Sequence, residues 1–153
     1  MTRLYEQIDT TLPLETTFEF VADFANAERW DPGVARSTRL DGGPIRVGSR
    51  FALDVRMGRR TAPMSYRVAT LERPHRVVLV GEGSGVRAVD EIVFESAGAG
   101  TRIVYTADIR LQGLLRLAQP FLSGAFARIG QDAAAGMHRT LADLATTARA
   151  VQP

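Results

Sequence analysis

The final third of the chain carries apolar residues at helical spacing. Between Leu114 and about Ala150 they recur at steps of three and four, which puts them on one face of a helix. At 1.5 Å per residue, a helix of this extent is roughly 45–55 Å long. Because Pro120 removes a backbone donor and crowds the preceding turn, we expect either a kink there or a short lead-in helix over residues 114–119, with the main helix starting at Pro120. The stripe consists of Leu114, Leu117, Phe121, Leu122, Ala125, Ile129, Ala133, Met137, Leu141, Leu144 and Ala148.

Ahead of this helix, seven segments show the alternation of apolar and polar residues that is typical of strands. They cover residues 3–11, 34–40, 49–57, 62–71, 75–82, 86–95 and 101–111. Short turns rich in Gly and Pro connect the last six, which predicts antiparallel pairing. After the first strand, Pro13 opens one short helix, and a second helical turn runs from Phe24 to Arg29, where Trp30-Asp31-Pro32 ends it.

These patterns predict an α+β fold, in which a curved seven-stranded antiparallel sheet wraps around the long C-terminal helix. Two short helices follow the first strand. One face of the sheet is apolar and the other is rich in Arg and Glu, so we expect only the apolar face to be covered. The chain has 153 residues, the size of one ordinary domain, and we expect a single domain over 1–153.

The helix stripe is uneven, because bulky residues alternate with Gly124, Gly130, Gly136 and many alanines. A curved sheet that faces so thin a helix face can leave a cavity instead of a filled core. The pattern therefore indicates a container for a hydrophobic small molecule. The expected ligand-binding residues share the apolar faces, with Trp30 either at the pocket mouth or packed against the short helices: Trp30, Phe51, Leu53, Val55, Met64, Tyr66, Val68, Asp90, Ile92, Tyr105, Phe121 and Met137.

Asp90 is a carboxylate on an apolar strand face, beside Ala88 and Ile92, where burial is costly without a partner. It is either a cavity acid that anchors a ligand hydroxyl or amine or works as a general acid or base, or it is the partner of an Arg, or a residue that a bulge places near the rim. Tyr66 and Tyr105 also fall on inner faces, as pocket hydroxyls or as core residues bonded to a backbone carbonyl. Asp90, Tyr66 and Tyr105 are thus the candidates for catalysis.

The composition narrows the chemistry. There is no Cys, and the two histidines, His75 and His138, have no ligand spacing, so we expect no metal and no cofactor. All 19 basic residues are Arg, against 17 acidic residues, and 7% aromatics do not suit a nucleic-acid surface. The basic group Arg56, Arg59, Arg60 and Arg67 is read as a solvated strand face, or as an attractor for an anionic ligand. No apolar run is long enough for a membrane span or a signal core, so we expect a cytoplasmic monomer or homodimer.

Three motifs carry a resemblance that covers nearly the whole chain. They are Pro13-x-Glu15 with Phe18, Phe20, Val21, Asp23 and Trp30-Asp31-Pro32; Leu71-Glu72-Arg73-Pro74; and Gly100-Thr101-Arg102-Ile103-Val104-Tyr105. In this order and spacing they resemble the polyketide cyclase/dehydrase and lipid-transport family of the START-like (SRPBCC) superfamily. The resemblance implies its helix-grip fold, and a superfamily of lipid carriers, ligand receptors and ring cyclases does not fix one function.

Three functions remain open from the sequence. The first is binding or transport of a hydrophobic small molecule such as a lipid, a polyketide or a quinone-like compound. The second is a polyketide cyclase or dehydratase, for which two or more polar side chains should converge in the cavity. The third is a protein-partner module, for which a large exposed apolar patch would be the sign.

Overall fold

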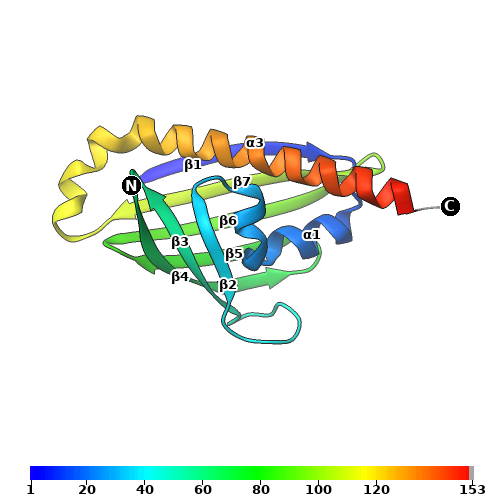
Figure 1. The fold of residues 1–153 in the computed structure, drawn as a ribbon, viewed down its shortest axis with the longest axis horizontal. Coiled ribbons are helices and arrows are strands. Elements are labelled where there is room, and N and C mark those ends of the chain that lie inside the picture. Colours follow the sequence, from blue (N-terminus) through cyan, green and yellow to red (C-terminus); the bar gives the residue numbers. More distant parts are fainter. Residues whose placement is uncertain (152–153) are drawn as a thin grey trace.

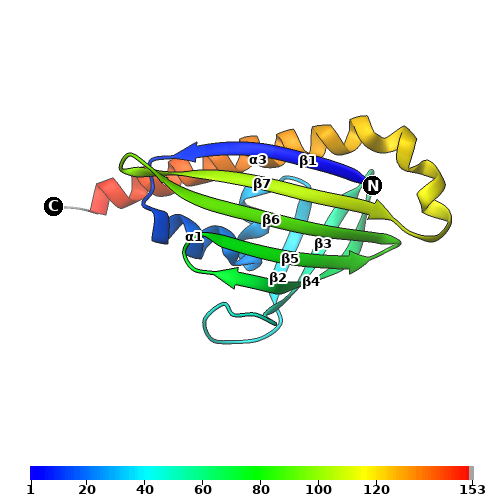
Figure 2. The ribbon, with the colours of Figure 1, turned by 180° about the vertical axis from the view of Figure 1, so that it is seen from behind.

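All seven predicted strands form, and they make one antiparallel sheet (Figures 1 and 2). The computed structural model describes residues 1–151, so the end of the predicted domain, 152–153, lies outside the described residues. The strands are β1 (Thr2–Thr10), β2 (Val34–Arg39), β3 (Arg50–Met57), β4 (Arg60–Glu72), β5 (Arg76–Gly83), β6 (Val86–Ala97) and β7 (Gly100–Leu111). The prediction of a curved sheet around a C-terminal helix is confirmed.

The strand order is β1-β7-β6-β5-β4-β3-β2, so the first strand pairs with the last. Thr10 lies opposite Thr101 and Thr2 opposite Ile109 in this pairing. The five hairpins from β2 to β7 place the other strands in sequence order. The chain therefore crosses from one edge of the sheet to the other immediately after β1, and the short helices make that crossing.

The helices all lie on one face of the sheet, as Figures 1 and 2 show from opposite sides. They are α1 (Leu14–Ala22), the 3₁₀ turn η1 (Phe24–Asn26), α2 (Ala27–Trp30), the 3₁₀ helix η2 (Gly113–Ala118) and α3 (Gln119–Val151). With 33 residues, α3 is about 50 Å long. It lies along β1 and against α2, not over the middle of the sheet, which leaves space between α3 and the strands β3 and β4.

Of the two alternatives expected near Pro120, a kink or a short lead-in helix, the lead-in helix forms. It is the separate 3₁₀ segment η2, just before α3. The buried side chain of Gln119 fixes the junction, because it bonds to the ends of both neighbouring strands. Gln119 Oε1 accepts from the N–H of Leu111 (3.1 Å), and its Nε2 donates to the carbonyl oxygen of Ile109 (2.7 Å) and to Thr2 Oγ1 (3.2 Å). Pro120 is then the second residue of α3, where its missing donor is of no consequence.

The start of the predicted helix stripe does not face the sheet. Leu114, Leu117 and Phe121 are 88%, 69% and 86% exposed, whereas Met137 and Leu141 are fully buried. The reason is geometric: η2 and the first turn of α3 extend beyond the end of the sheet, as Figure 1 shows, so these three side chains are largely uncovered within the described chain. The stripe packs against the buried core from Ala133 onward, and its earlier residues Leu122, Ala125 and Ile129 line the cavity.

A close approach between helices fixes the position of α2. A Cβ atom at Gly136 would lie 2.1 Å from the carbonyl oxygen of Trp30, so only glycine fits at this crossing. One turn further along α3, Thr140 Oγ1 donates to the carbonyl oxygen of Arg29 (2.9 Å). The glycine noted in the sequence as thinning the helix face thus brings the backbone of α2 against α3, and with it the ring of Trp30.

Candidate functional site

A cavity of about 470 Å³ lies between α3, the short helices and the concave face of the sheet. This volume is in the range of small-molecule sites, which run ~300–1,000 Å³. Most of its lining is aliphatic or aromatic, and it draws on β1, β3, β4, β6, β7, α2 and α3. Its charged lining residues are Glu6, Asp31, Arg56 and Asp90.

Eight of the twelve residues proposed from the sequence line this cavity. They are Trp30, Leu53, Val55, Met64, Tyr66, Asp90, Tyr105 and Met137. The other four lie outside the lining. Phe51, Val68 and Ile92 are fully buried in the packed core, at the end of the sheet that α1 and η1 fill. Phe121 is exposed at the start of α3, and the cavity is lined instead by Phe126, five residues further along the helix and on a different face.

The Asp90 carboxylate points to the concave side of β6 and is 6% exposed. β6 pairs with β5 and β7 in regular register around it, so the bulge considered for this position is absent there. Its partner is the hydroxyl of Tyr105, which donates to Asp90 Oδ2 at 2.6 Å. Within residues 1–151 no Arg pairs with it. The pairing with an Arg considered for Asp90 therefore does not form among these residues.

Burial raises the pKa of Asp90 to about 7, because the charged form loses water and the hydrogen bond from Tyr105 compensates only in part. The nearby carboxylates of Asp31 and Asp108 add to the rise. The phenol of Tyr105 has a pKa raised well above its usual value by burial and by the neighbouring Asp90. At neutral pH this pair holds a proton that it can readily gain or lose, which is the property required of an acid–base group.

Asp31 is a second cavity carboxyl, which sequence reasoning treated only as part of a helix stop. Its Oδ1 accepts the backbone N–H of Gly33 at 2.8 Å, which fixes the loop between α2 and β2. Burial raises the pKa of Asp31 to about 6, against the lowering effect of that hydrogen bond. The signal that could have found it is the Asp-Pro-Gly sequence, since Asp commonly accepts an N–H two residues on in such turns.

The ring of Tyr66 packs over Gly81 on the neighbouring strand and lines the cavity. A Cβ at Gly81, its partner on β5, would lie 2.4 Å from Tyr66 Cζ, so the ring occupies the space that a side chain at this position would take. The pKa of its phenol is raised well above the usual value, first by burial and then by Asp90 and Asp31. Its hydroxyl has no hydrogen-bond partner among the described residues, in contrast to that of Tyr105.

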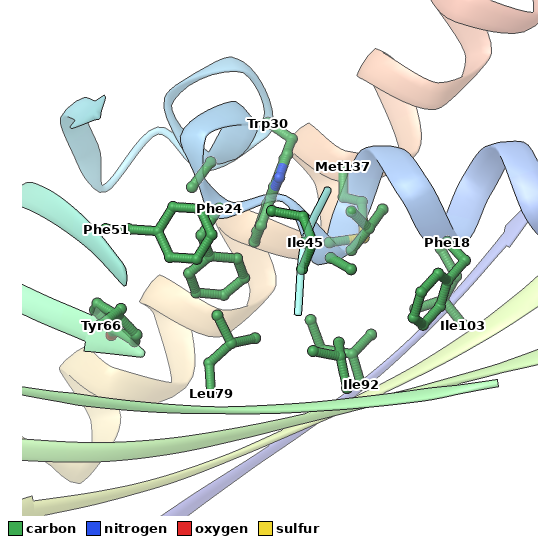
Figure 3. Packing of buried hydrophobic residues seen from close by; sticks show 14 of the residues in the cluster. Phe18, Phe24, Trp30, Ile45, Phe51, Tyr66, Leu79, Ile92, Ile103 and Met137 are labelled. Atoms are coloured by element: carbon green, nitrogen blue, oxygen red, sulfur yellow. The ribbon is translucent and has the colours of Figure 1, made fainter. Parts of the chain in front are cut away.

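Aromatic rings form one side of the site. The ring of Trp30 lies edge-on to Tyr105 and to Phe24, with 6.0 Å between centroids in each case, and Phe24 lies 5.3 Å from Tyr66. Figure 3 shows Phe24 next to Trp30 and Phe51. Trp30 is 3% exposed, so it both packs against the short helices and lines the cavity. Its Nε1–H has no acceptor within the described part of the chain.

The remaining polar candidates lie away from this group. Arg59, Arg60 and Arg67 are exposed, and Arg56 lies at the cavity edge with its Nε donating to the carbonyl oxygen of Pro32 (3.1 Å). Both histidines are exposed, and residues 1–151 contain no group of three His, Asp or Glu side chains placed to hold a metal ion. None of the helices described is both long and apolar enough to cross a membrane.

The architecture defines a class of protein: a curved antiparallel sheet closed by a long C-terminal helix around a cavity is the helix-grip fold. A family model described as "Polyketide cyclase / dehydrase and lipid transport" matches residues 1–149. The chain therefore belongs to the polyketide cyclase/dehydrase and lipid-transport family, within the START-like superfamily. No curated protein matches the sequence.

Solved structures share the fold at low sequence identity. A START superfamily protein from Mycobacterium smegmatis has a TM-score of 0.76 at 13% identity, over 92% of this chain and 97% of that one. An aromatase/cyclase from Streptomyces has a TM-score of 0.73 at 13% identity, over 98% and 95%. A Thermus thermophilus protein has a TM-score of 0.75 at 13% identity, over 91% and 96%. At such identities the likeness concerns the fold alone.

Proposed function

We propose that this protein binds an apolar small molecule in the cavity beneath α3. The observation that carries the proposal is the cavity itself: about 470 Å³ of space, bounded mainly by apolar side chains from both layers of the fold. Removing an apolar ligand from water stabilises its complex by about 25 cal/mol for each Å² buried. The family, whose description includes lipid transport, supports the same function.

The first experiment is native mass spectrometry of the protein after gentle purification, followed by extraction and identification of any bound compound. A cavity-filling variant, Ala133→Phe, tests the place of binding, because Ala133 lines the cavity from α3. Ala127→Phe is the matched control, since Ala127 is on the same helix, exposed and outside the lining. We expect the copurified mass, or binding of an added apolar fluorophore, to be lost in the first variant and kept in the second.

Equal binding by the two variants would place the ligand elsewhere. If neither the wild type nor any variant retains or takes up an apolar compound, the carrier function is wrong. Mass spectrometry detects a bound compound of any identity, so the experiment separates a carrier with a bound cargo from a protein whose cavity stays empty.

An acid–base enzyme is the second candidate, and the pair of Asp90 and Tyr105 favours it. Cyclisation and dehydration of a polyketide chain require removal of a proton next to a carbonyl and delivery of one to a leaving hydroxyl. Asp90, with a pKa of about 7, suits both roles. Turnover of a poly-β-carbonyl substrate that falls at least about 100-fold in Asp90→Asn would support the enzyme. Unchanged turnover in that variant would remove Asp90 from the mechanism.

The protein-partner alternative rests on the exposed apolar side chains at the start of α3 and in η2. If a second copy of the chain covers Leu117 and Phe121, the wild type sediments as a dimer, and the double variant Leu117→Ser/Phe121→Ser as a monomer. A wild type that stays monomeric at high concentration would exclude a homodimer through this surface.

A further inference from the structure

The charge of the cavity wall is unbalanced. Of its four charged residues, Glu6, Asp31 and Asp90 are acidic, and Arg56 alone is basic. Arg56 is exposed at the edge, and its Nε is bonded to a backbone carbonyl. Neither Asp31 nor Asp90 has an ion-pair partner within residues 1–151. A buried carboxylate without a cation is costly, so the wall as it stands favours a positively charged group between these acids.

Aromatic rings surround the same place. Phe24, Trp30, Tyr66 and Tyr105 all line the cavity, and each lies within 6.0 Å of another of the four, centroid to centroid. The face of an aromatic ring attracts a cation electrostatically, with Trp the strongest, and groups of rings are the usual enclosure of alkylammonium ions. Phe24 and Trp30 are almost fully buried, so an ammonium group here would be held away from bulk water.

One carboxylate oxygen of Asp90 is free to accept a hydrogen bond from a ligand. The only hydrogen bond to Asp90 in the described chain is to Oδ2, which leaves Oδ1 available. Trp30 Nε1, on a side chain that is only 3% exposed, has no acceptor among residues 1–151. An ammonium group can donate to Asp90 Oδ1, whereas the Trp30 N–H needs an acceptor, which an ammonium group does not carry.

We propose that the ligand of this cavity is an apolar amine, bound with its ammonium group against the carboxylate of Asp90, with Asp31 nearby, and its apolar part along α3. The inference rests on the proposed function and names the chemical class of its ligand. In the absence of the amine, the two acids keep protons over part of the neutral range, since their pKa values are about 7 and about 6. Binding replaces those protons by the ammonium ion.

The titratable and charged groups that face Asp90 or act on it through their charge come from several elements, and Asp108 acts from the outer face, where it pairs with Arg3 (2.7 Å). β7 contributes Tyr105 and Asp108, β4 contributes Tyr66, and the loop before β2 contributes Asp31. The residues directly opposite it on β5 and β7 are Leu79 and Ala107, which carry no charge. From β1 and β3 the cavity receives Glu6 and Arg56, and Asp132 of α3 acts on Asp31. Acids dominate this set, so the ammonium is favoured as they deprotonate.

The experiment compares three probes of equal length: octylamine, 1-octanol and octanoate, titrated calorimetrically into the full-length protein at pH 8. An alkylammonium group has a pKa near that of Lys, ~10.4, so octylamine is charged throughout. We expect octylamine to bind at least about tenfold more tightly than octanol, and octanoate to bind least. Between pH 5.5 and pH 8 the affinity for octylamine should rise at least about tenfold as the acids lose their protons, while that for octanol stays constant.

Variants locate the effect. Asp90→Asn should lower the affinity for octylamine about tenfold or more and change that for octanol less than twofold. Glu91→Gln is the matched control, because Glu91 is the next residue on β6, faces outward and pairs with Arg76 (2.9 Å). It should leave both affinities unchanged. Asp31→Asn gives a second test if Asp90→Asn does not fold, with a smaller loss expected for octylamine alone.

The outcomes separate the two proposals. If octanol or octanoate binds as tightly as octylamine in the wild type, the amine inference is overturned and the apolar-ligand function stands. The amine inference is also overturned, and the apolar-ligand function still stands, if Glu91→Gln and Asp90→Asn lower the octylamine affinity equally. If none of the three probes binds, the proposed function fails together with the inference.

Discussion

The backbone carbonyl of Trp30 occupies the space in which a side chain at position 136 would begin, 2.1 Å from an ideal Cβ. Gly136 therefore determines how closely α3 approaches α2, and with it where the ring of Trp30 lies in the cavity wall. A relationship between two backbones is rigid, because neither can turn away as a side chain can.

Gly136→Ala should lower the free energy of unfolding by about 1–3 kcal/mol, because the added methyl group forces the helices apart. Gly124→Ala is the control on the same helix, with nothing within 4 Å of the added atom. It should stabilise by up to ~1 kcal/mol through helix propensity. Urea unfolding measures both. Equal effects of the two substitutions would show that the close contact is not a constraint in solution.

Replacement of Asp90 by Asn should change how stability depends on pH. Burial raises the pKa of Asp90 to about 7 in the folded protein, above its usual value of 3.8. The folded state therefore holds this proton more tightly than the unfolded state does, so Asp90 favours folding at low pH and loses that contribution as the pH rises toward 7. Relative to the wild type, Asp90→Asn should gain about 2 kcal/mol of stability between pH 5 and pH 8.

Denaturant unfolding at the two pH values measures this change, and Glu91→Gln serves as the outward-facing control. A stability difference between wild type and Asp90→Asn that is the same at pH 5 and pH 8 would contradict the raised pKa of this carboxyl.

The hydroxyl of Tyr105 should lower the pKa of Asp90, since it donates a hydrogen bond to the charged form. Tyr105→Phe removes that donor and keeps the ring, so the pKa of Asp90 should rise above about 7. The carboxyl carbon resonance of Asp90, followed by NMR through a pH titration, reports it directly. A midpoint that stays in place or falls would mean that the hydrogen bond does not form in solution.

Trp30→Phe should have little effect on the ligand-free protein. Trp30 loses part of its packing in this variant, but an unpaired buried donor is lost with it, and such a donor costs about 1–3 kcal/mol. We expect a net change below about 1 kcal/mol in the free energy of unfolding. Trp30→Ala, which removes the ring as well, should cost about 3–5 kcal/mol. If Trp30→Phe is as destabilising as Trp30→Ala, the indole N–H has a partner in solution, such as a bound water.

Strand faces could be predicted from the sequence because they depend on local geometry. The alternation in β6 and β7 places Asp90 and Tyr105 on the concave side, where they meet. Which inward residues border open space could not be predicted, because that depends on how the short helices fill the sheet. Phe18 packs on Phe94 (5.0 Å between centroids), and this closes one end of the core and leaves the cavity at the other.

Which face of α3 lines the cavity could not be predicted either, for a different reason. Leu117 and Phe121 fit the helical spacing, and so do Leu122 and Phe126. Only Leu122 and Phe126 line the cavity, whereas Leu117 and Phe121 are exposed. Within α3 the choice depends on how the helix is rotated about its axis, which the buried residues Met137 and Leu141 fix, while the change from 3₁₀ to α geometry at Gln119 rotates Leu117 as well. Local periodicity contains no information about that rotation.

A pair of truncations at either end of α3 tests this assignment. Leu141→Ala should cost about 2–5 kcal/mol, because Leu141 is fully buried. Phe121→Ala should change stability by less than about 0.5 kcal/mol, as expected for a side chain that water already surrounds. Thermal or urea unfolding distinguishes them readily. A large cost for Phe121→Ala would indicate that another surface covers this residue in solution.

The pairing of β1 with β7 determines how late in synthesis β1 can find its partner strand. Thr10 lies opposite Thr101, so about 90 residues must follow β1 out of the ribosome before its partner exists. At 5–20 residues per second, this first strand waits for roughly 5–20 s. During that interval the hairpins from β2 to β6 can form one after another, while β1 has an unpaired backbone edge. The cavity closes last, when β7 brings in β1 and α3 follows, so a ligand present during translation meets the site before its final wall is in place.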